Sequence, residues 1–485
     1  MPAIGAQMGR SRREKRSINN LSRSRTSKRP MQDQTPEWVI KINSCLEEGP
    51  DYDSGRWWTI YRVPRNMRLV HRNSFIPKII SIGPFHNGEP GLESMEEHKM
   101  RYLLRLLGGR SKENRVQAEG PVPQVHGNVQ LEELERAMRA LEPQARERYS
   151  EYFDMDSDEF VQMMVLDGCF VIELLRLYTC EKEGKNVDDP IFTTRWMLRT
   201  LQRDLLMLEN QLPFFVLEEL YLLTRLAEEP SLQEITVTFF DPLLPRENRL
   251  CKLDKEEEFD HLLDVFRSTF LSSVIDKTST LEWKQIRKKG GLSLVQERQL
   301  IHSVSELQEA RVKLKNRSDR DLLDIKFKGG VLEISTLYLD DNTVPLLLNC
   351  VAYEQSDQDA KPFFTNYFMF FDSIINSTVD VEILHQNRII NHVLGSNEDV
   401  ANLFNKLGRE IVYDLDDCYL SKQIKGINDH CKAYYASKWH VWWANLINDY
   451  FSTPWSFLSL LAAIVLLLLT AGQTFYAIYA YYRPP

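Results

Sequence analysis

The feature that most constrains this chain is a long apolar stretch close to its C-terminal end. It reads PWSFLSLLAAIVLLLLTAGQTFYAIYAYY from Pro454 to Tyr482 and contains no Asp, Glu, Lys or Arg. A helix needs about 20 mostly apolar residues to cross the hydrocarbon of a bilayer. Trp455 at one end and several tyrosines at the other suit the headgroup level. We therefore predict a transmembrane helix over 454–482. A buried core helix is the alternative, although such helices seldom run this long without a charge.

The position of this stretch predicts a topology. Only residues 483–485 follow it, so we expect the rest of the chain on one side of the membrane. The N-terminus shows no apolar run of about 7–15 residues ahead of a small-residue cleavage site. These features predict a single-pass, tail-anchored protein whose lipid partner is the bilayer around this helix. The simplest arrangement places the large domain in the cytosol, and we expect the plasma membrane.

Charge is distributed unevenly along the chain. The net charge is −9, but residues 1–30 contain nine Lys or Arg and one Glu, which leaves −17 for residues 31–485. An acidic body argues against a nucleic-acid partner, because such surfaces are basic. The seven cysteines are scattered without a CxxC pair, so neither a disulfide framework nor a zinc site is indicated. Reduced thiols suit a cytosolic domain.

Residues 1–36 are basic, rich in serine and nearly free of apolar side chains. Such a segment cannot bury enough surface to fold, so we predict a disordered tail. A nuclear-localisation-like cluster at Arg10–Arg16, a transit peptide and a polybasic contact with anionic lipid are its functional interpretations. We assign residues 37–450 to one mainly helical domain, followed by the span 454–482 and the short tail 483–485.

The first half of this domain has strong helical patterns. Apolar spacing predicts helices over Met95–Leu107 and Phe160–Tyr178, and the second is apolar nearly all round, as a buried helix would be. Pro213 divides Asp204–Leu223, so we expect one helix to end near Gln211 and another to begin with the proline in its first turn.

The second half is predicted to contain the β-structure. Leu323–Asp340 alternates around Gly329–Gly330, which is typical of a β-hairpin. Helical spacing from Leu307 to Leu314 predicts a helix, and the charged stretches 227–256 and 277–300 predict loops. The expected fold class is mainly α, or α+β with a small β-hairpin.

Motifs that would indicate an enzyme are missing from the sequence. There is no GxxxxGK[ST], GxGxxG, HExxH or GxSxG, and so no common phosphate, dinucleotide, zinc or serine-hydrolase signature. Asp154-Met-Asp156-Ser-Asp158 begins like a calcium loop, but Val165 stands where the bidentate Glu should be. We therefore predict no metal and no cofactor, and interpret these acids as a helix start.

Two carboxylates are the more interesting candidate catalytic residues, whereas His86 and His98 are lone histidines of a kind that is usually structural or exposed. Asp167 (VLDGCF) and Glu209 (LENQLP) lie within apolar runs, where an unpaired charge is costly. A pKa raised by burial would suit a general acid. The same burial fits a structural carboxylate that accepts backbone hydrogen bonds or pairs with an Arg, and structural networks also perturb carboxylates. We therefore assign no catalytic residue.

Several ordered motifs together resemble one plant family, called domain of unknown function 247. They are IYRVP, SIGPFHNG, MEEHKMRYL, FVQMMVLDGCFVIELL, DLLMLENQLPFFVLEELY, SELQEARVKLK, LLDIKFKGGVLEI, VAYEQ and the ending ANLINDYFSTPWSFLSLLAAIVLLLLTAGQTFYA. The resemblance runs from about Ile60 to Tyr482. His86-Asn87 replaces the usual paired His, and the basic N-terminal extension lies outside the family pattern.

The resemblance implies a plant membrane protein with a mainly helical domain and a C-terminal transmembrane helix. It implies no agreed activity and no catalytic residues, although some grass members are linked to self-incompatibility. We expect a non-catalytic interaction, recognition or signalling module with a protein partner. The alternative is an enzyme of unrecognised class that uses Asp167, Glu209 or both. Three glycosylation triplets, at Asn20, Asn316 and Asn376, would matter only if the body faced a lumen.

Overall fold

The computed structural model describes the greater part of the predicted domain and the C-terminal helix. The described residues are Val39 and residues 58–108, 129–225, 229–243, 258–275, 302–317, 322–413, 418–436, 442–443, 445–447 and 454–482. The predicted tails 1–36 and 483–485 and the predicted loop 277–300 lie outside them.

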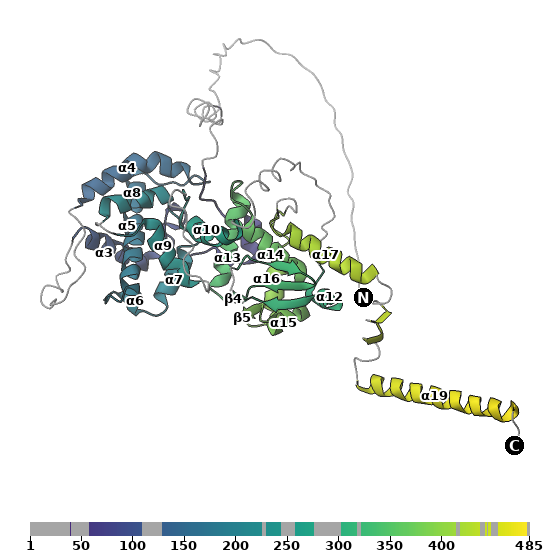
Figure 1. The fold of residues 1–485 in the computed structure, drawn as a ribbon. Coiled ribbons are helices and arrows are strands. Elements are labelled where there is room, and N and C mark those ends of the chain that lie inside the picture. The colour runs from purple at the N-terminus through teal and green to yellow at the C-terminus, as the bar shows by residue number, and fades with distance from the viewer. Residues whose placement is uncertain are drawn as a thin grey trace, which may run out of the picture. The chain divides into compact units, whose positions relative to one another are not determined.

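Helices dominate the described chain, and the strands are short (Figure 1). In chain order the elements are α2 (Arg65–Val70), η1 (Arg72–Ser74), η2 (Pro84–His86), η3 (Glu93–Met95), α3 (Glu96–Leu106), α4 (Leu131–Glu147), α5 (Ser157–Lys182), α6 (Pro190–Thr193), α7 (Met197–Asp204), α8 (Phe214–Thr224), α9 (Leu232–Phe240), η5 (Asp241–Leu243), α10 (Leu262–Ile275), α12 (Val304–Glu309), β1 (Lys313–Asn316), β2 (Lys326–Lys328), β3 (Val331–Ile334), β4 (Leu337–Leu339), α13 (Thr343–Ser356), α14 (Phe363–Ile374), α15 (Thr378–Gln386), β5 (Ile390–His392), α16 (Asn397–Leu407), α17 (Ser421–Ala436) and α19 (Pro454–Tyr482).

Helix α5 is the centre of the first half. It begins with a capping box, in which Asp156 accepts from the Glu159 N–H and the Glu159 carboxylate accepts from the Asp156 N–H. Nearly every side chain from Phe160 to Tyr178 is buried, as the all-round apolar pattern predicts. The helix lies among α3, α4, α8 and α9 (Figure 1).

The second half packs around α13 and α14, which are also apolar on most sides. Helix α14 contacts α13 and α16, and α10 joins the halves because it contacts both α9 and α13. Rings of α14 and α16 stack, with the Phe371 and Phe404 centroids 5.5 Å apart. One continuous hydrophobic core therefore extends from Ile60 to Cys431.

The strands form two small sheets. The first has the order β1-β3-β2, with β3 parallel to β1 and antiparallel to β2, and the second pairs β4 with β5 in parallel. The predicted hairpin is confirmed. Gly329 and Gly330 form its turn with φ values of 59° and 77°, a region where a side chain would be strained.

The prediction of a helix ending near Gln211 is wrong, because α7 ends at Asp204. The Gln211 amide donates to the Leu205 and Met207 carbonyls, at 2.7 and 2.8 Å, which folds residues 205–212 into turns. Helix α8 does begin after Pro213, which occupies its N-cap position.

Two other predictions of local structure are also wrong. The stretch 227–256 contains α9, which begins with a capping box between Ser231 and Glu234 and packs on α5. The helix predicted to reach Leu314 ends at Glu309. Arg311, with φ of 60°, turns the chain into β1, so Leu314 lies in a strand.

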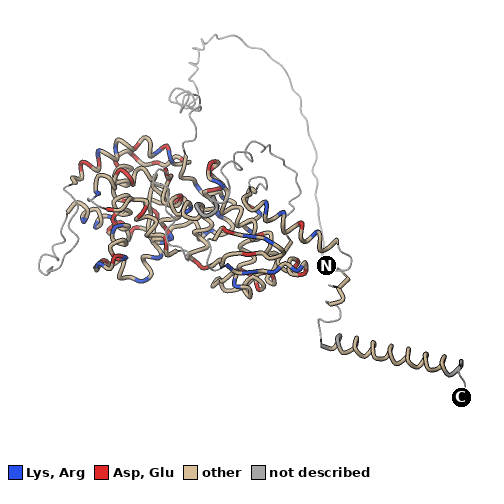
Figure 2. The backbone as a smooth tube through the Cα atoms, in the orientation of Figure 1, with Lys and Arg blue, Asp and Glu red and all other residues tan. Residues whose placement is uncertain are grey.

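Helix α19 is long and apolar enough to cross a membrane. Its segment Leu458–Tyr479 has 22 residues and a mean hydropathy of 2.1, and the share of the segment buried against the protein is 0%. Exposed apolar side chains contradict the alternative of a buried core helix. Figure 2 shows no Lys, Arg, Asp or Glu along this helix, in contrast to the body.

Candidate functional site

Residues 75–83 form neither helix nor strand, yet much of this segment is buried. Ile80 and Ile82 are among the least exposed side chains of the protein. Backbone N–H and C=O groups buried outside regular structure must find other partners. Polar side chains from α5, from the end of α7 and from the turns between α7 and α8 provide them.

The last residue of α7 and the turns that follow it bind the backbone of this segment from one side. The Asp204 carboxylate accepts hydrogen bonds from the N–H groups of Lys78 and Ile79, both at 2.8 Å. The Asn210 amide accepts from the Ile82 N–H at 2.7 Å and donates to the Ile80 carbonyl at 3.2 Å. Both side chains therefore replace the hydrogen bonds that a neighbouring strand would make.

Asp167, the first predicted carboxylate, is held by α5 at the end of the same segment. It accepts from the Gly83 N–H at 2.9 Å and pairs with the Lys99 ammonium of α3 at 2.6 Å. Burial raises the pKa of Asp167, against the opposing effects of Lys99 and Gly83. Burial would lower the pKa of Lys99, but its ion pairs with Asp167 and Glu96 outweigh this and raise it.

Gly83 is required where Asp167 binds. Its φ of 77° favours glycine, and a Cβ there would lie 2.4 Å from the Gln211 carbonyl oxygen. The Tyr149 hydroxyl donates to that same carbonyl at 3.1 Å. The chain therefore passes between α5 and the α7–α8 turns with no space for a side chain.

Glu209, the second predicted carboxylate, is fully buried and binds the segment before α2. It accepts from the Val63 N–H at 2.6 Å and pairs with the Arg62 guanidinium at 3.0 Å. The Arg68 guanidinium of α2 also donates to it. His86 Nε2 lies 3.7 Å away and has no hydrogen-bond partner among the described residues. Two cations, each about 30% exposed, therefore neutralise one buried carboxylate.

An open pocket of about 450 Å³ lies on the surface beside this carboxylate. It is lined by Arg62, Val63, Pro64, Arg65, Arg68 and Glu151. The Arg62 guanidinium stacks over the Phe85 ring at 4.1 Å and also pairs with Glu151 at 3.4 Å. Arg65 is exposed and makes no ion pair with a described residue. The pocket therefore presents guanidinium groups to solvent.

The geometry gives both predicted carboxylates partners that a reacting acid would have to release. Asp167 and Glu209 bind two parts of one N-terminal segment, and neither lines the pocket. A general acid or base needs access to the proton that it transfers. Within the described residues, no group of three His, Cys, Asp or Glu side chains could hold a metal ion. The arrangement suits a structural network that shapes a guanidinium-rich surface.

A second buried network was missed by the sequence analysis. Glu354 of α13 pairs with Arg267 of α10 at 2.9 Å and accepts from the Phe364 and Thr365 N–H groups of α14 at 3.1 and 2.8 Å. Burial raises the pKa of Glu354, which Arg267 opposes. The sequence signal was the carboxylate in the apolar run VAYEQ. Its partner is not visible there because Arg267 lies 87 residues away in the chain.

A family model described as a plant protein of unknown function, DUF247, matches residues 60–469. The Arabidopsis thaliana protein named UPF0481 protein At3g47200 is 33% identical over 433 residues, covering 87% of this chain and 86% of its own. Another from the same plant, putative UPF0481 protein At3g02645, is 24% identical and covers 91% of this chain and 95% of its own. No solved structure matches.

Proposed function

The chain belongs to the DUF247 family of plant proteins of unknown function, and from that premise we propose that it is a non-catalytic, membrane-anchored interaction module. Its body binds a protein partner, and α19 holds it in the bilayer. The body faces the cytosol at the plasma membrane, in a recognition or signalling role. No nucleic acid takes part.

One observation carries the non-catalytic part of this proposal. Glu209, the better placed of the two carboxylates, is occupied by a backbone N–H and two guanidinium groups. Removing a proton from a substrate would require Glu209 to exchange these partners. Such an exchange would leave Arg62 and Arg68 without their carboxylate partner, which costs stability. The enzyme hypothesis would therefore require Glu209 to give up these three partners.

The guanidinium pocket is the surface we assign to the partner. Arg65, which pairs with no acid of the described chain, lies at its rim, and Leu69, four residues along α2, is 77% exposed. A cation beside an exposed apolar side chain suits a partner segment with a carboxylate next to an apolar residue. Arginine suits this role because its planar fork can bind a carboxylate with two hydrogen bonds.

The partner test uses a photo-crosslinking amino acid in place of Leu69, in the full-length chain in plant membranes. A single protein adduct is expected, and R65E in the same chain should abolish it. R72E, which changes an exposed arginine outside the pocket, is the matched control and should leave the adduct intact. An adduct equally strong with R65E would contradict the proposed surface.

Sidedness is tested with Asn376, whose triplet Asn376-Ser-Thr is exposed just before α15. A lumenal body would present this triplet to the glycosylation machinery. Asn316 is a poorer acceptor because its amide donates to the Arg388 carbonyl and to Thr336. We expect an unglycosylated, protease-accessible body in intact plant-cell membranes. Glycosylation that N376Q removes would place the body on the opposite side.

The absence of catalysis is tested with D167N and E209Q, after each purified full-length variant has been shown to fold. Any substrate turnover seen with the parent chain should be unchanged in both variants. A turnover that disappears in one folded variant and persists in the other would establish the enzyme alternative.

A further inference from the structure

The three-stranded sheet carries lysines at alternate positions on both of its edge strands. In the register of the sheet, Lys313 and Lys328 flank Val331, and Lys315 and Lys326 flank Glu333. Residues in register point to the same face of a sheet. The four lysines therefore share one face, which we call the lysine face (Lys313, Lys315, Lys326 and Lys328).

The lysine face is exposed and positively charged. Lys313, Lys315 and Lys328 are exposed and Lys326 is half-buried, whereas Leu332 on the opposite face is fully buried. Glu333 pairs with Lys315 at 2.8 Å, and Asp324 pairs with Lys326 at 3.2 Å. Lys313 and Lys328 make no ion pair with a described residue. Two uncompensated cations thus stand together on a body that is acidic overall.

The opposite face of the sheet packs on α17, which precedes the membrane helix in the chain. A Cβ on Gly426 would lie 3.2 Å from the Phe327 ring, and the Phe327 and His430 rings are 5.9 Å apart. Residues 437–453 connect α17 to α19 and can span at most about 60 Å. This tether keeps the sheet at an effective concentration on the order of millimolar near the surface that α19 enters.

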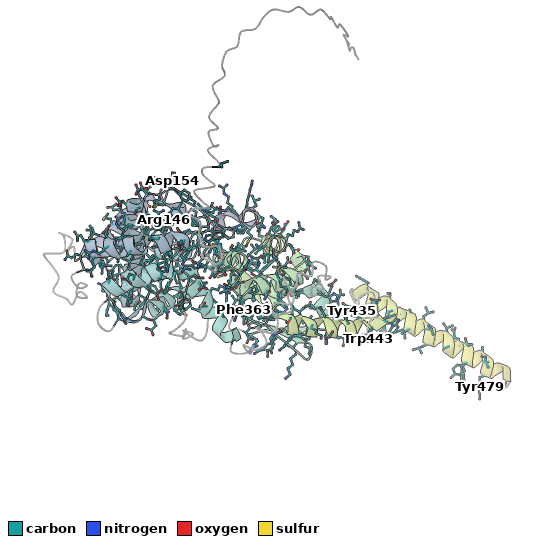
Figure 3. All side chains as sticks on the ribbon, turned by 90° about the horizontal axis from the view of Figure 1, so that it is seen from above. Arg146, Asp154, Phe363, Tyr435, Trp443 and Tyr479 are labelled. Atoms are coloured by element: carbon teal, nitrogen blue, oxygen red, sulfur yellow. The ribbon has the colours of Figure 1, made fainter. Side chains whose placement is uncertain are left out.

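Amphipathic aromatic residues occupy part of that connection. Trp442 and Trp443 are 54% and 41% exposed, and Trp side chains favour the headgroup level of a bilayer. Figure 3 labels Tyr435, Trp443 and Tyr479, which follow one another from α17 through the connection to α19. The segment that joins α17 to α19 therefore carries aromatic side chains suited to headgroups.

We propose that the lysine face binds the anionic surface of the membrane that holds α19, through the phosphate and carboxylate groups of its lipids. This inference rests on the proposed membrane anchoring. Each lysine near an anionic leaflet strengthens binding about fivefold at physiological salt. Anionic lipids of this kind are enriched in the cytoplasmic leaflet, which agrees with the proposed cytosolic body. Docking fixes the body against the bilayer and leaves the guanidinium pocket to a partner.

The test reconstitutes the full-length chain in nanodiscs of phosphatidylcholine alone or with about 30% phosphatidylserine, near physiological salt. Lysines are acetylated briefly with a neutral reagent, and each site is quantified by mass spectrometry. Acetylation of Lys313 and Lys328 should fall several-fold in the anionic discs and recover at about 0.5 M NaCl. Lys185, which is exposed after α5 and pairs with Glu183, is the internal control and should not change.

A double variant isolates the electrostatic contribution. K313Q/K328Q should weaken docking about 25-fold, which removes the protection of Lys315 and Lys326 in anionic discs. K182Q/K185Q is the matched control and should retain the protection of Lys315 and Lys326. Equal acetylation of Lys313 and Lys328 in both disc types would overturn the proposal, because their protection would then not depend on the lipid. A chain that fails to enter either disc would instead contradict the membrane anchoring, so the two failures are distinguishable.

Discussion

Glu209 is a buried carboxylate of the N-terminal network that pairs with two arginines. It accepts one backbone hydrogen bond and two guanidinium hydrogen bonds from residues that lie about 140 positions earlier in the chain. Removing one partner of a buried ion pair is far more costly than the pair itself is favourable, because an uncompensated charge is left behind. The two arginines are partly exposed and can turn toward water, which reduces this cost.

We expect E209A to lower the free energy of unfolding by about 3 kcal/mol and E209Q by about half as much, since Gln can still accept from the Val63 N–H. The measurement is urea unfolding of the full-length protein in detergent. E151A is the matched control, because Glu151 also pairs with Arg62 but is 60% exposed, and it should cost less than about 0.5 kcal/mol. Equal effects of E209A and E151A would show that the network is not structural.

His261 is a buried residue whose protonation state is fixed by its contacts. Its Nε2–H donates to the Thr59 carbonyl at 3.1 Å, and its Nδ1 accepts from the Asp264 N–H at 3.1 Å. A second proton would have to displace that N–H. Burial lowers the pKa of His261, against the opposing charges of Asp264 and Asp260, and Arg267 also lowers it.

The lowered pKa predicts how stability depends on pH. The unfolded chain protonates His261 near pH 6.5, where the folded chain does not, so the unfolded state binds more protons below that pH. The neutral His261 therefore contributes to the free energy of unfolding above pH 6.5. This contribution is lost as the pH falls toward the pKa of His261 in the folded chain, by about 1.4 kcal/mol per pH unit. Between pH 7.5 and pH 5, urea unfolding should show that the stability of the parent chain falls more steeply with decreasing pH than that of H261Q. If the stabilities of the two chains changed with pH in parallel, the lowered pKa of His261 would be contradicted.

At the scale of elements, α5 depends on how it begins. Asp156 caps it, whereas Asp154 is exposed and has no hydrogen bond among the described contacts. Figure 3 labels Asp154 and also Arg146, whose guanidinium donates to the Asp156 carbonyl at 3.0 Å. The run of acids therefore has different roles at neighbouring positions.

We expect D156A to cost about 1 kcal/mol of stability, because an N-cap side chain satisfies an otherwise unpaired N–H. D154A is the matched control and should cost no more than about 0.3 kcal/mol, since Asp154 contributes only an interaction with the helix dipole. Thermal unfolding of both variants in detergent measures the difference. If D154A proved as costly as D156A, the dipole rather than the cap would stabilise the start of α5.

The elements that could be predicted from the sequence are those with a strong local signal. The apolar periodicity of α5 and the alternation around Gly329–Gly330 both gave the correct structure. Local patterns failed where long-range contacts decide. Leu314 fits a helical spacing, but pairing with β3 places it in a strand. Gln211 ends no helix because its amide binds the carbonyls behind it.

The same division applies to the candidate site. The burial of Asp167 and Glu209 could be predicted from the apolar runs around them. Their partners could not, because Gly83 and Val63 donate through backbone N–H groups, which carry no signal in the side-chain sequence. Identifying a carboxylate as structural therefore requires the fold of the segment that it binds.

At the scale of the whole molecule, the proposed membrane association rests on two features. Helix α19 offers an apolar segment of 22 residues, or about 33 Å of helix, enough for a hydrocarbon layer of about 30 Å. The lysine face offers charge that salt can screen. An apolar span resists salt and alkaline extraction, whereas an electrostatic contact does not.

We therefore expect a chain lacking residues 454–485 to leave the membrane fraction at alkaline pH, while the full-length chain remains. The double variant L466R/L467R should be released in part, because each Arg near the centre of a span costs about 2.5–3.5 kcal/mol on insertion. L466I/L467I is the matched control and should stay in the membrane.

The truncated chain provides a further distinction at neutral pH. If it binds anionic vesicles and is released by salt, α19 supplies the anchoring and the lysine face supplies the contact. If it resists salt and alkali as the full-length chain does, another part of the protein holds the membrane, and α19 is not its anchor.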